Sequence, residues 1–401
     1  MWAEVDLAAV RHNAGWLRRL VAPAALCAVV KADAYGMGAV AVGRAALEGG
    51  ASWLAVAMVE EGAALRRSGI DAPVLLLSEP VPEAMEAVVA HRLTPTLCTT
   101  AGVAALGAAV SGSGGGFEGR VPVEVHVKVD TGMHRVGADP GELVAVVRAV
   151  EAAPGLRLGA LWTHLAVADE VDDESRGFTA GQLARFEQAR RAVAEAGISV
   201  PLVHAANSAG ALAWPTSRLD MVRCGIALYG VAPSPDLASL VDGGRGEGEG
   251  LHPVLSLHAR VSHVRVLDAG ERPSYGRRRP LSRRSVVATV PIGYADGVPR
   301  RYFAAGGTVL VGGRRHPLAG AVTMDQIVVD CGPGAAVSVG DDVVLIGEQG
   351  TESLTVEDWA ETLDTIGYEV LTGIGARVPR VPVGGGRAVE DTERCGTEER
   401  A

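Results

Sequence analysis

Eight short apolar segments, each followed by a stretch of helical period, constrain the fold of this chain more than any other feature. They are rich in Val and Leu and lie at 26–31, 53–58, 73–78, 93–98, 121–130, 158–165, 201–206 and 219–226. The apolar runs are continuous rather than alternating, as expected of strands that are buried on both faces of a parallel sheet. Eight such units in this length predict a (β/α)8 barrel. Periodicity alone also allows a doubly wound open sheet.

The composition and the pattern of apolar residues change after about residue 232. A Gly- and Glu-rich stretch is followed by short alternating segments with Gly and Pro turns, which are typical of an antiparallel β domain. The last residues have almost no apolar content, which favours disorder. We therefore expect a barrel at 1–235, a flexible connection at 236–250, an antiparallel β domain at 251–382 and a disordered tail at 383–401.

Composition excludes several classes of function. The net charge is -10, from 37 basic and 47 acidic residues, which disfavours nucleic acid and anionic membranes as partners. The five cysteines stand singly and form no CxxC pair, so neither a zinc site nor a disulfide framework is expected. Residues 1–13 carry acidic groups where a signal peptide needs basic ones, and no apolar run reaches transmembrane length. These features predict a soluble, cytoplasmic protein that uses no metal.

Polar residues stand at or just after the carboxyl ends of the predicted strands. In a barrel these ends line one mouth, where active sites are built. Convergence of so many polar side chains on one face is not required for folding and therefore indicates a site. The residues are Lys31, Lys128, Arg135, His164, Asn207, Ser208 and Arg223.

Lys31 ends the first predicted barrel strand. A lysine here is paired, extends to solvent or is used chemically, because burying its charge is costly. The motif KADAYGMG predicts a tight turn that returns Tyr35 to the same mouth. A lysine whose pKa is lowered by such surroundings can bond covalently to an aldehyde cofactor.

The segment RCGIALYG, at 223–230, comes last in the predicted barrel. Loops after strands seven and eight usually hold the phosphate group in this fold. Gly225 would let backbone N–H groups approach a phosphate, although a plain strand-to-helix turn also explains it. That simpler explanation leaves Arg223 inside the mouth without an acceptor.

Nine motifs together resemble the alanine racemase family. They are VVKADAYGMG, VKVDTGMHRVG, THLA, HAANSAG, VRCGIALYG, PSYG, PIGYADG, TMDQ and GYEV, and they occur in the family's order and spacing over about residues 1–382. The resemblance implies a barrel followed by a β domain, and pyridoxal 5'-phosphate as cofactor.

The resemblance also implies a role for particular residues. Lys31 is similar to the lysine that carries the cofactor and serves one face of the substrate, and Tyr275 to the base of the other face, supplied by the second subunit of a homodimer. Arg223 matches the arginine that contacts the pyridine nitrogen, and His164 matches the residue that links this arginine to the tyrosine. Positions similar to those that hold the cofactor phosphate are Tyr35, Asn207, Ser208, Gly225, Ile226 and Tyr368, and positions similar to substrate contacts are Arg135, Tyr294 and Met324.

Lys128 matches a lysine that is often carbamylated, and the new negative charge would orient Arg135. Pairing with Asp130 or Glu124 at the barrel rim is the simpler alternative. Departures from the commonest family pattern at Met37, His134, Ala321 and Thr323 remove no group needed for proton transfer, but they bear on the shape of the pocket.

The implied function is the interconversion of L-alanine and D-alanine, which supplies D-alanine for cell-wall peptidoglycan. A racemase of serine or of another small amino acid is the first alternative, and a pyridoxal-phosphate decarboxylase is the second. Decarboxylation needs no base on the second face and usually pairs the pyridine nitrogen with a carboxylate, so Tyr275 and Arg223 argue against it. A non-enzymatic cofactor carrier would lack the β domain.

Overall fold

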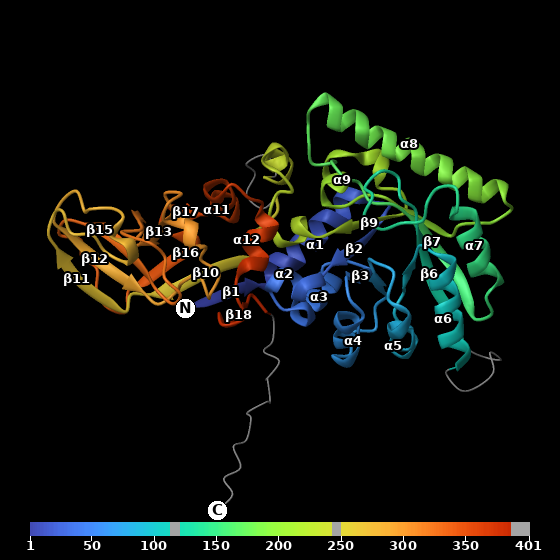
Figure 1. Cartoon of the computed structure of the whole chain (residues 1–401), viewed down its shortest axis with the longest axis horizontal. Helices are drawn as coiled ribbons and strands as arrows, with labels where there is room; N and C mark the ends of the chain where they lie inside the picture. The colour runs from blue at the N-terminus through green and yellow to red at the C-terminus, as the bar shows by residue number, and fades with distance from the viewer. Residues whose placement is uncertain (113–120, 243–249, 386–401) are drawn as a thin grey trace, which may run out of the picture.

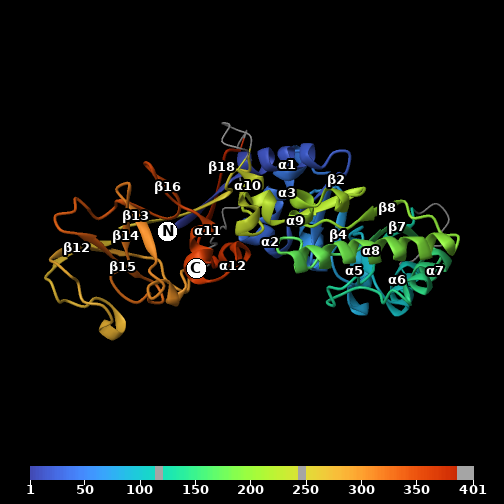
Figure 2. The same ribbon diagram turned by 90° about the horizontal axis from the view of Figure 1, so that it is seen from above.

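The computed structural model describes residues 1–112, 121–242 and 250–385. The structure has two lobes, an α/β lobe and a β lobe, which lie side by side along the longest axis of the molecule. Strands β1 and β18 and helix α12 lie between them (Figure 1; Figure 2). Over the described residues, no helix has the length and apolar character needed to cross a membrane.

The α/β lobe is a closed parallel barrel. Its strands are β2 (Ala25–Val29), β3 (Trp53–Val56), β4 (Val74–Leu76), β5 (Thr96–Leu97), β6 (Val123–Lys128), β7 (Leu156–Trp162), β8 (Leu202–His204) and β9 (Met221–Cys224). They form two parallel ladders, β4-β3-β2-β9 and β5-β6-β7-β8. An isolated bridge between Leu75 and Thr94 joins the ladders on one side, and the Arg223 N–H donates to the Ala206 carbonyl on the other. Because β9 pairs with β2, the sheet is closed, and the predicted barrel is confirmed over the doubly wound alternative.

Helical segments precede, connect and follow these strands, and the longer ones cover the outside of the barrel (Figure 1). They are α1 (Leu7–Val21), α2 (Lys31–Gly36), α3 (Ala39–Glu48), α4 (Val59–Arg67), η1 (Pro82–Ala84), α5 (Met85–Ala90), α6 (Thr100–Gly112), α7 (Leu143–Ala152), α8 (Asp173–Glu195), α9 (Ser208–Ala213), η2 (Pro215–Ser217) and η3 (Ile226–Tyr229). The longest, α8, begins where the Asp172 side chain accepts from the Ser175 N–H at 3.0 Å. Phe186 and Val193 lie on its buried face, as an amphipathic helix packed on a core requires.

The C-terminal lobe is a predominantly antiparallel β domain, as predicted. Its strands are β10 (Leu255–Arg260), β11 (His263–Leu267), β12 (Ser285–Val290), β13 (Thr308–Val311), β14 (Arg314–Pro317), β15 (Ile327–Gly332), β16 (Asp342–Gln349), β17 (Glu352–Leu354) and β18 (Arg380–Val383). One sheet has the order β14-β13-β16-β10-β1-β18, with β17 paired to β16, and a second sheet has the order β11-β12-β15. Short helical segments complete the lobe: η6 (Tyr275–Arg277), η7 (Arg300–Tyr302), α11 (Val356–Leu363) and α12 (Gly367–Gly373).

Strand β1 (Trp2–Asp6) belongs to the sheet of the β domain, although it opens the chain. It pairs antiparallel with β10 and parallel with β18. Asp6 then caps α1 by accepting from the Ala8 and Ala9 N–H groups, so the chain passes directly from the β domain into the barrel. The sequence pattern did not predict this strand.

The expected flexible connection is described only in part. Residues 235–241 form η4 (Pro235–Leu237) and α10 (Ala238–Val241). Residues 243–249 lie outside the described residues, as does most of the expected tail, at 386–401.

Candidate active site

A cavity of about 800 Å³ opens at the carboxyl ends of the barrel strands. It brings together most of the residues that the sequence singled out. These are Lys31, Tyr35, Lys128, Arg135, His164, Asn207, Ser208, Arg223, Gly225, Ile226 and Tyr368. Lys31 and Lys128 are the only two lysines of the chain, so every lysine amine in this protein lies in one cavity.

The turn that carries Lys31 is left-handed. Ala32, Asp33, Ala34 and Tyr35 have φ of 52°, 52°, 54° and 56°, so α2 is a single turn of left-handed helix built from non-glycine residues. Such residues cost roughly 1–2 kcal/mol each in this conformation, so surrounding contacts must hold the turn.

Two side chains from other elements hold this turn. The Glu61 carboxylate accepts from the Ala32 N–H at 2.6 Å, and Arg380 Nε donates to the Gly36 carbonyl at 2.8 Å. Glu61 was not predicted as part of the site. Its carboxylate also accepts from the Met58 N–H at 3.0 Å, but methionine at this N-cap position gives no capping signature in the sequence.

Burial lowers the pKa of Lys31 below its ordinary value, and the nearby Arg135 guanidinium lowers it further, while Glu61 acts in the opposite direction. A lowered pKa increases the fraction of neutral amine at neutral pH. Only the neutral amine can act as a nucleophile or accept a proton. The environment therefore suits Lys31 to both roles.

Arg223 lies fully inside the mouth and is held by several acceptors. One Nη donates to His204 Nδ1 at 2.6 Å, and the other donates to the Thr163 and Ala205 carbonyls, each at 2.9 Å. Its Nε is buried and has no hydrogen-bond partner among the described residues. A buried donor without a partner is costly, so Nε–H is a site for an acceptor atom of a ligand.

His164 lies beside this arginine, with its Nδ1 at 3.3 Å from an Nη of Arg223. Burial and then the Arg223 charge hold the pKa of His164 well below its ordinary value. The imidazole is therefore neutral, and its Nδ1 can accept from the guanidinium. Burial also lowers the pKa of Arg223 to about 10, which still leaves it protonated at neutral pH.

Trp162 lies among the cations of the cavity. Lys128 Nζ is 4.5 Å and Arg223 Cζ is 4.4 Å from the centre of its ring. Burial, followed by the Arg223 charge, lowers the pKa of Lys128 to about 8. The neutral and charged forms of this amine are therefore both accessible near physiological pH.

Gly225 lies where the backbone leaves β9. Its N–H donates to the Ser208 hydroxyl at 3.0 Å, and a Cβ at this position would overlap the Tyr35 hydroxyl. The Tyr35 ring packs between Tyr229 and Tyr368, at 4.6 Å and 6.1 Å between ring centres. Gly225 thus lets the Tyr35 side chain come close to the backbone, and the hydroxyl groups of Tyr35, Ser208 and Tyr368 line this part of the cavity, where they can donate to a phosphate.

The remaining predicted residues lie on the β domain, away from this cavity. Tyr275, Tyr294 and Met324 are exposed by 72%, 42% and 52%, and none of them lines it. They come from neighbouring loops, because the Tyr294 N–H donates to the Thr323 carbonyl at 3.0 Å, next to Met324. Within one chain, Lys31 and Tyr275 do not meet in one cavity.

Some cavity residues were not predicted from the sequence, among them Leu77, Ser78, Glu369 and Thr372. Ser78 ends the apolar segment 73–78, so the strand-end rule that found the other residues could have found it too. Glu369 and Thr372 come from α12, which the β pattern did not predict.

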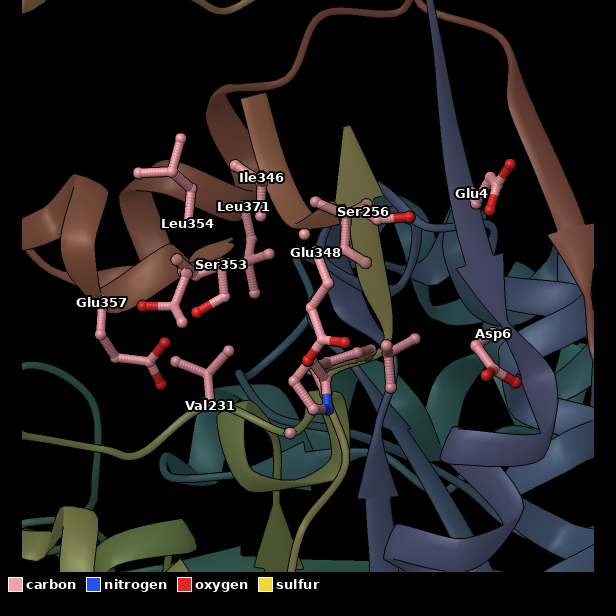
Figure 3. A pocket seen from close by; sticks show the side chains of 18 of the residues that line it. Glu4, Asp6, Val231, Ser256, Ile346, Glu348, Ser353, Leu354, Glu357 and Leu371 are labelled. Atoms are coloured by element: carbon pink, nitrogen blue, oxygen red, sulfur yellow. The ribbon is translucent and has the colours of Figure 1, made fainter. Parts of the chain in front are cut away.

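A second cavity, of about 290 Å³, lies at the junction between the barrel and the β domain (Figure 3). Its lining combines apolar side chains such as Val231 and Leu371 with the carboxylates of Glu4, Glu348 and Glu357. Among the described residues that line it there is no lysine, arginine or histidine. The amine and guanidinium groups that can hold an aldehyde or an anion are therefore those of the strand-end cavity.

A closed parallel barrel whose cationic groups meet in one cavity at the carboxyl mouth defines this chain as a barrel enzyme. Comparison with known families is specific. The alanine racemase N-terminal domain matches residues 5–233, and the alanine racemase C-terminal domain matches residues 254–382. The chain belongs to the alanine racemase family, which confirms the resemblance in its motifs, and it is a racemase, an isomerase.

Individual relatives match this chain along nearly their whole length. The alanine racemase of Symbiobacterium thermophilum is 45% identical over 94% of this chain and 96% of its own, and that of a Nostoc species is 41% identical over 95% of each. The alanine racemase of Bacillus anthracis, solved with bound L-Ala-P, superposes with a TM-score of 0.86 at 35% identity, covering 97% of this chain and 96% of its own. That of Streptomyces lavendulae, which produces D-cycloserine, has a TM-score of 0.85 at 37% identity, covering 96% and 97%.

Proposed function

We propose that this protein interconverts L-alanine and D-alanine with pyridoxal 5'-phosphate as cofactor, and that its Lys31 and Tyr275 exchange the α-proton on opposite faces of the substrate. The observation that carries the proposal is the arrangement around Lys31: an amine of lowered pKa shares a cavity with the unpartnered Nε–H of Arg223.

The residues of the cavity fit this cofactor. Arg223 Nε–H would donate to the pyridine nitrogen, and the Nζ of Lys31 would hold the aldehyde carbon. The part of the cavity next to Gly225 would take the phosphate, which Tyr35, Asn207, Ser208, Ile226 and Tyr368 would surround. When bound, the cofactor spreads the negative charge that remains at the α-carbon after the proton leaves.

Racemisation requires that protons be exchanged on both faces of a planar centre, which one base on one face cannot do. Lys31 Nζ takes or returns the proton on the face toward the barrel, and Arg135 binds the substrate carboxylate. Arg223 donates a hydrogen bond and keeps its proton, since a guanidinium does not deprotonate in this pH range. With such a donor, the ring nitrogen of the cofactor would stay unprotonated, which would favour racemisation over transamination.

The second base requires a partner subunit. Tyr275, Tyr294 and Met324 form an exposed face of the β domain and are not in their own chain's cavity. We propose a homodimer in which the β domain, residues 251–382, places the partner subunit's Tyr275 above the barrel mouth formed by residues 1–235. A twofold axis would create two equal sites in this way.

The biological role that fits this activity is the supply of D-alanine for peptidoglycan in the cytoplasm. Its support is the match to alanine racemases along the whole chain and the absence, among the described residues, of a helix that could span a membrane.

The direct test incubates the purified holoenzyme with each L-amino acid in deuterated water and follows chirality and deuterium at the α-carbon. Alanine should become racemic and deuterated. Serine should react more slowly by a finite factor, since a small change in side chain is worth only about 1–3 kcal/mol in a pocket of this kind. Equal or higher kcat/KM for serine would assign the site to that substrate, and release of CO2 without racemisation would overturn the proposal.

A further inference from the structure

A column of polar side chains crosses the core of the barrel beneath the cavity. Glu124, His126 and Lys128 alternate along β6, so their side chains lie on the same face of the strand. Lys128 lines the mouth, His126 is fully buried, and Glu124 lies at the start of the strand, toward the opposite end of the barrel. A barrel core is normally filled with apolar side chains, so this column needs a reason.

Hydrogen bonds join the column to Arg223. His204 Nδ1 accepts from Arg223 at 2.6 Å, and His204 Nε2 lies 3.2 Å from His126 Nδ1. His126 Nε2 lies 3.4 Å from a carboxylate oxygen of Glu124, whose other oxygen pairs with Arg157. The chain of contacts thus runs from the cavity to the far end of the barrel.

Each hydrogen bond in this chain can point in only one direction. A guanidinium only donates, so His204 Nδ1 carries no proton. Burial holds the pKa of both histidines below the ordinary value, so each imidazole is neutral and has one N–H. His204 must then donate through Nε2 to His126 Nδ1, and His126 must donate through Nε2 to the Glu124 carboxylate.

The neighbouring strand makes room for Glu124. The register between β6 and β7 shifts at this point: Val125 pairs with Leu158, but His126 pairs with Ala160, which leaves Gly159 unpaired. A Cβ at Gly159 would overlap the Glu124 side chain. Glycine at a bulge often marks a close approach of this kind, and here it lets the carboxylate lie next to His126.

We propose that Glu124 is a positioning residue that acts through His126 and His204 to fix the Arg223 guanidinium, and thereby aims Arg223 Nε–H into the cavity. The donor-only guanidinium at one end and the acceptor-only carboxylate at the other favour the same pair of tautomers, so Glu124 adds to the preference that Arg223 sets. A carboxylate behind a histidine orients metal-bound imidazoles in the same way. The contribution of this orientation of Arg223 to racemisation rests on the function proposed above. The tautomers of His126 and His204 do not depend on that function.

The test compares the holoenzyme with three variants that affect the same link in different ways. Glu124→Ala removes the acceptor, Gly159→Ala displaces the intact carboxylate, and Glu124→Gln keeps a neutral acceptor at the same place. The matched control is Glu187→Ala, because Glu187 pairs with Arg190 and Arg191 on the exposed side of α8 and touches no histidine.

Two measurements are made on each protein. Nitrogen-15 NMR of the labelled histidines reports the tautomers of His126 and His204. Kinetics report kcat and KM for alanine, together with the share of turnovers that end in transamination.

In the parent enzyme both histidines should be protonated at Nε2 alone. Glu124→Ala and Gly159→Ala should lose this fixed pattern and lower kcat about tenfold, the rate equivalent of one hydrogen bond to a charged group, with a smaller change in KM. Their share of transamination should rise. Glu124→Gln should recover most of kcat, and Glu187→Ala should match the parent.

Unchanged tautomers and unchanged kcat in both Glu124→Ala and Gly159→Ala would overturn the proposal. So would an equal loss in all three variants that follows only their unfolding temperatures, because that result describes a structural role. If the parent enzyme shows the predicted tautomers but does not racemise alanine, the proposed function fails while the positioning of Arg223 stands.

Discussion

The barrel mouth and the exposed face of the β domain contrast sharply. At the mouth, buried groups hold each other in place, and their pKa values are shifted: that of Lys128 to about 8 and that of Arg223 to about 10. On the β domain, Tyr275 is exposed by 72%. In the proposed dimer, the barrel of one chain would supply a preorganised half of each site, and the exposed β-domain face of the partner would supply the other half.

The largest expected effect comes from the mouth. Lys31→Ala should reduce racemisation by about 10³-fold or more, since it removes both a general base and the attachment point of the cofactor. Borohydride reduction of the parent enzyme, followed by peptide mapping, should place the cofactor on Lys31. Lys128 is the only other lysine, so it is the natural internal control, and a label found there would contradict the assignment.

Mixing variants tests whether the two halves come from different chains. Lys31→Ala and Tyr275→Phe should each be nearly inactive, with Tyr275→Phe slower by about 10²–10⁴-fold. In a heterodimer with shared sites, one site collects both defects and the other has neither, so activity should return at up to one working site per dimer. Proven subunit exchange without recovered activity would show that both groups act within one chain.

Replacement of Arg223 tests whether its guanidinium keeps the pyridine nitrogen of the cofactor unprotonated. A glutamic acid at this position can share a proton with the ring nitrogen, so Arg223→Glu should raise the ratio of transamination to racemisation while lowering the overall rate. The ratio is measured from pyruvate formed per D-alanine formed. Arg223→Lys keeps a positive donor and serves as the control, and an unchanged ratio in Arg223→Glu would refute the role given to this arginine.

The smallest expected effect concerns Lys128. Its folded-state pKa, about 8, lies below the ordinary value of 10.5, so between these values the unfolded chain binds more protons than the folded one. The free energy of unfolding should therefore rise with pH through this window, by about 1–3 kcal/mol in total. Urea unfolding in CO2-free buffer should show this slope in the parent and a smaller slope in Lys128→Met, where Lys31 alone among the lysines still contributes.

Adding bicarbonate gives a second test of Lys128, by the mass of the intact protein. If Lys128 is carbamylated, as the family resemblance implies, the intact protein should gain the mass of one CO2 as the pH rises through about 8, because only the neutral amine reacts. The Lys128→Met variant should gain none. If the mass of the parent protein stays unchanged in bicarbonate, Lys128 is an unmodified amine.

Local patterns explain which parts of the molecule were predictable. Continuous apolar strands predicted the barrel, and strand-end polar residues such as Lys31 and His164 predicted its cavity. The helix α11 was missed although Thr355 and Asp358 form a capping box that is visible in the sequence. This capping box is a local signal, so the start of α11 can be predicted from the sequence.

Other features depend on contacts between distant residues. Strand β1 joins the β domain because Trp2 pairs with His258, and five residues at the start of a chain do not reveal such a partner. In the same way, His126 and His204 are unremarkable until the barrel brings them together. In the proposed dimer, the place of Tyr275 over the partner's cavity would be a property of the assembly, which the local sequence does not encode.

The left-handed turn at Lys31 has a consequence for synthesis of the protein on the ribosome. Arg380, which holds the Gly36 carbonyl, and β18, which pairs with β1, are translated after all the barrel strands. A nascent chain can therefore complete its barrel, with Glu61 in place at the Lys31 turn, before Arg380 reaches the Gly36 carbonyl. Premature termination before residue 380 would release a chain that has every barrel strand but lacks one of the two side chains that hold this turn.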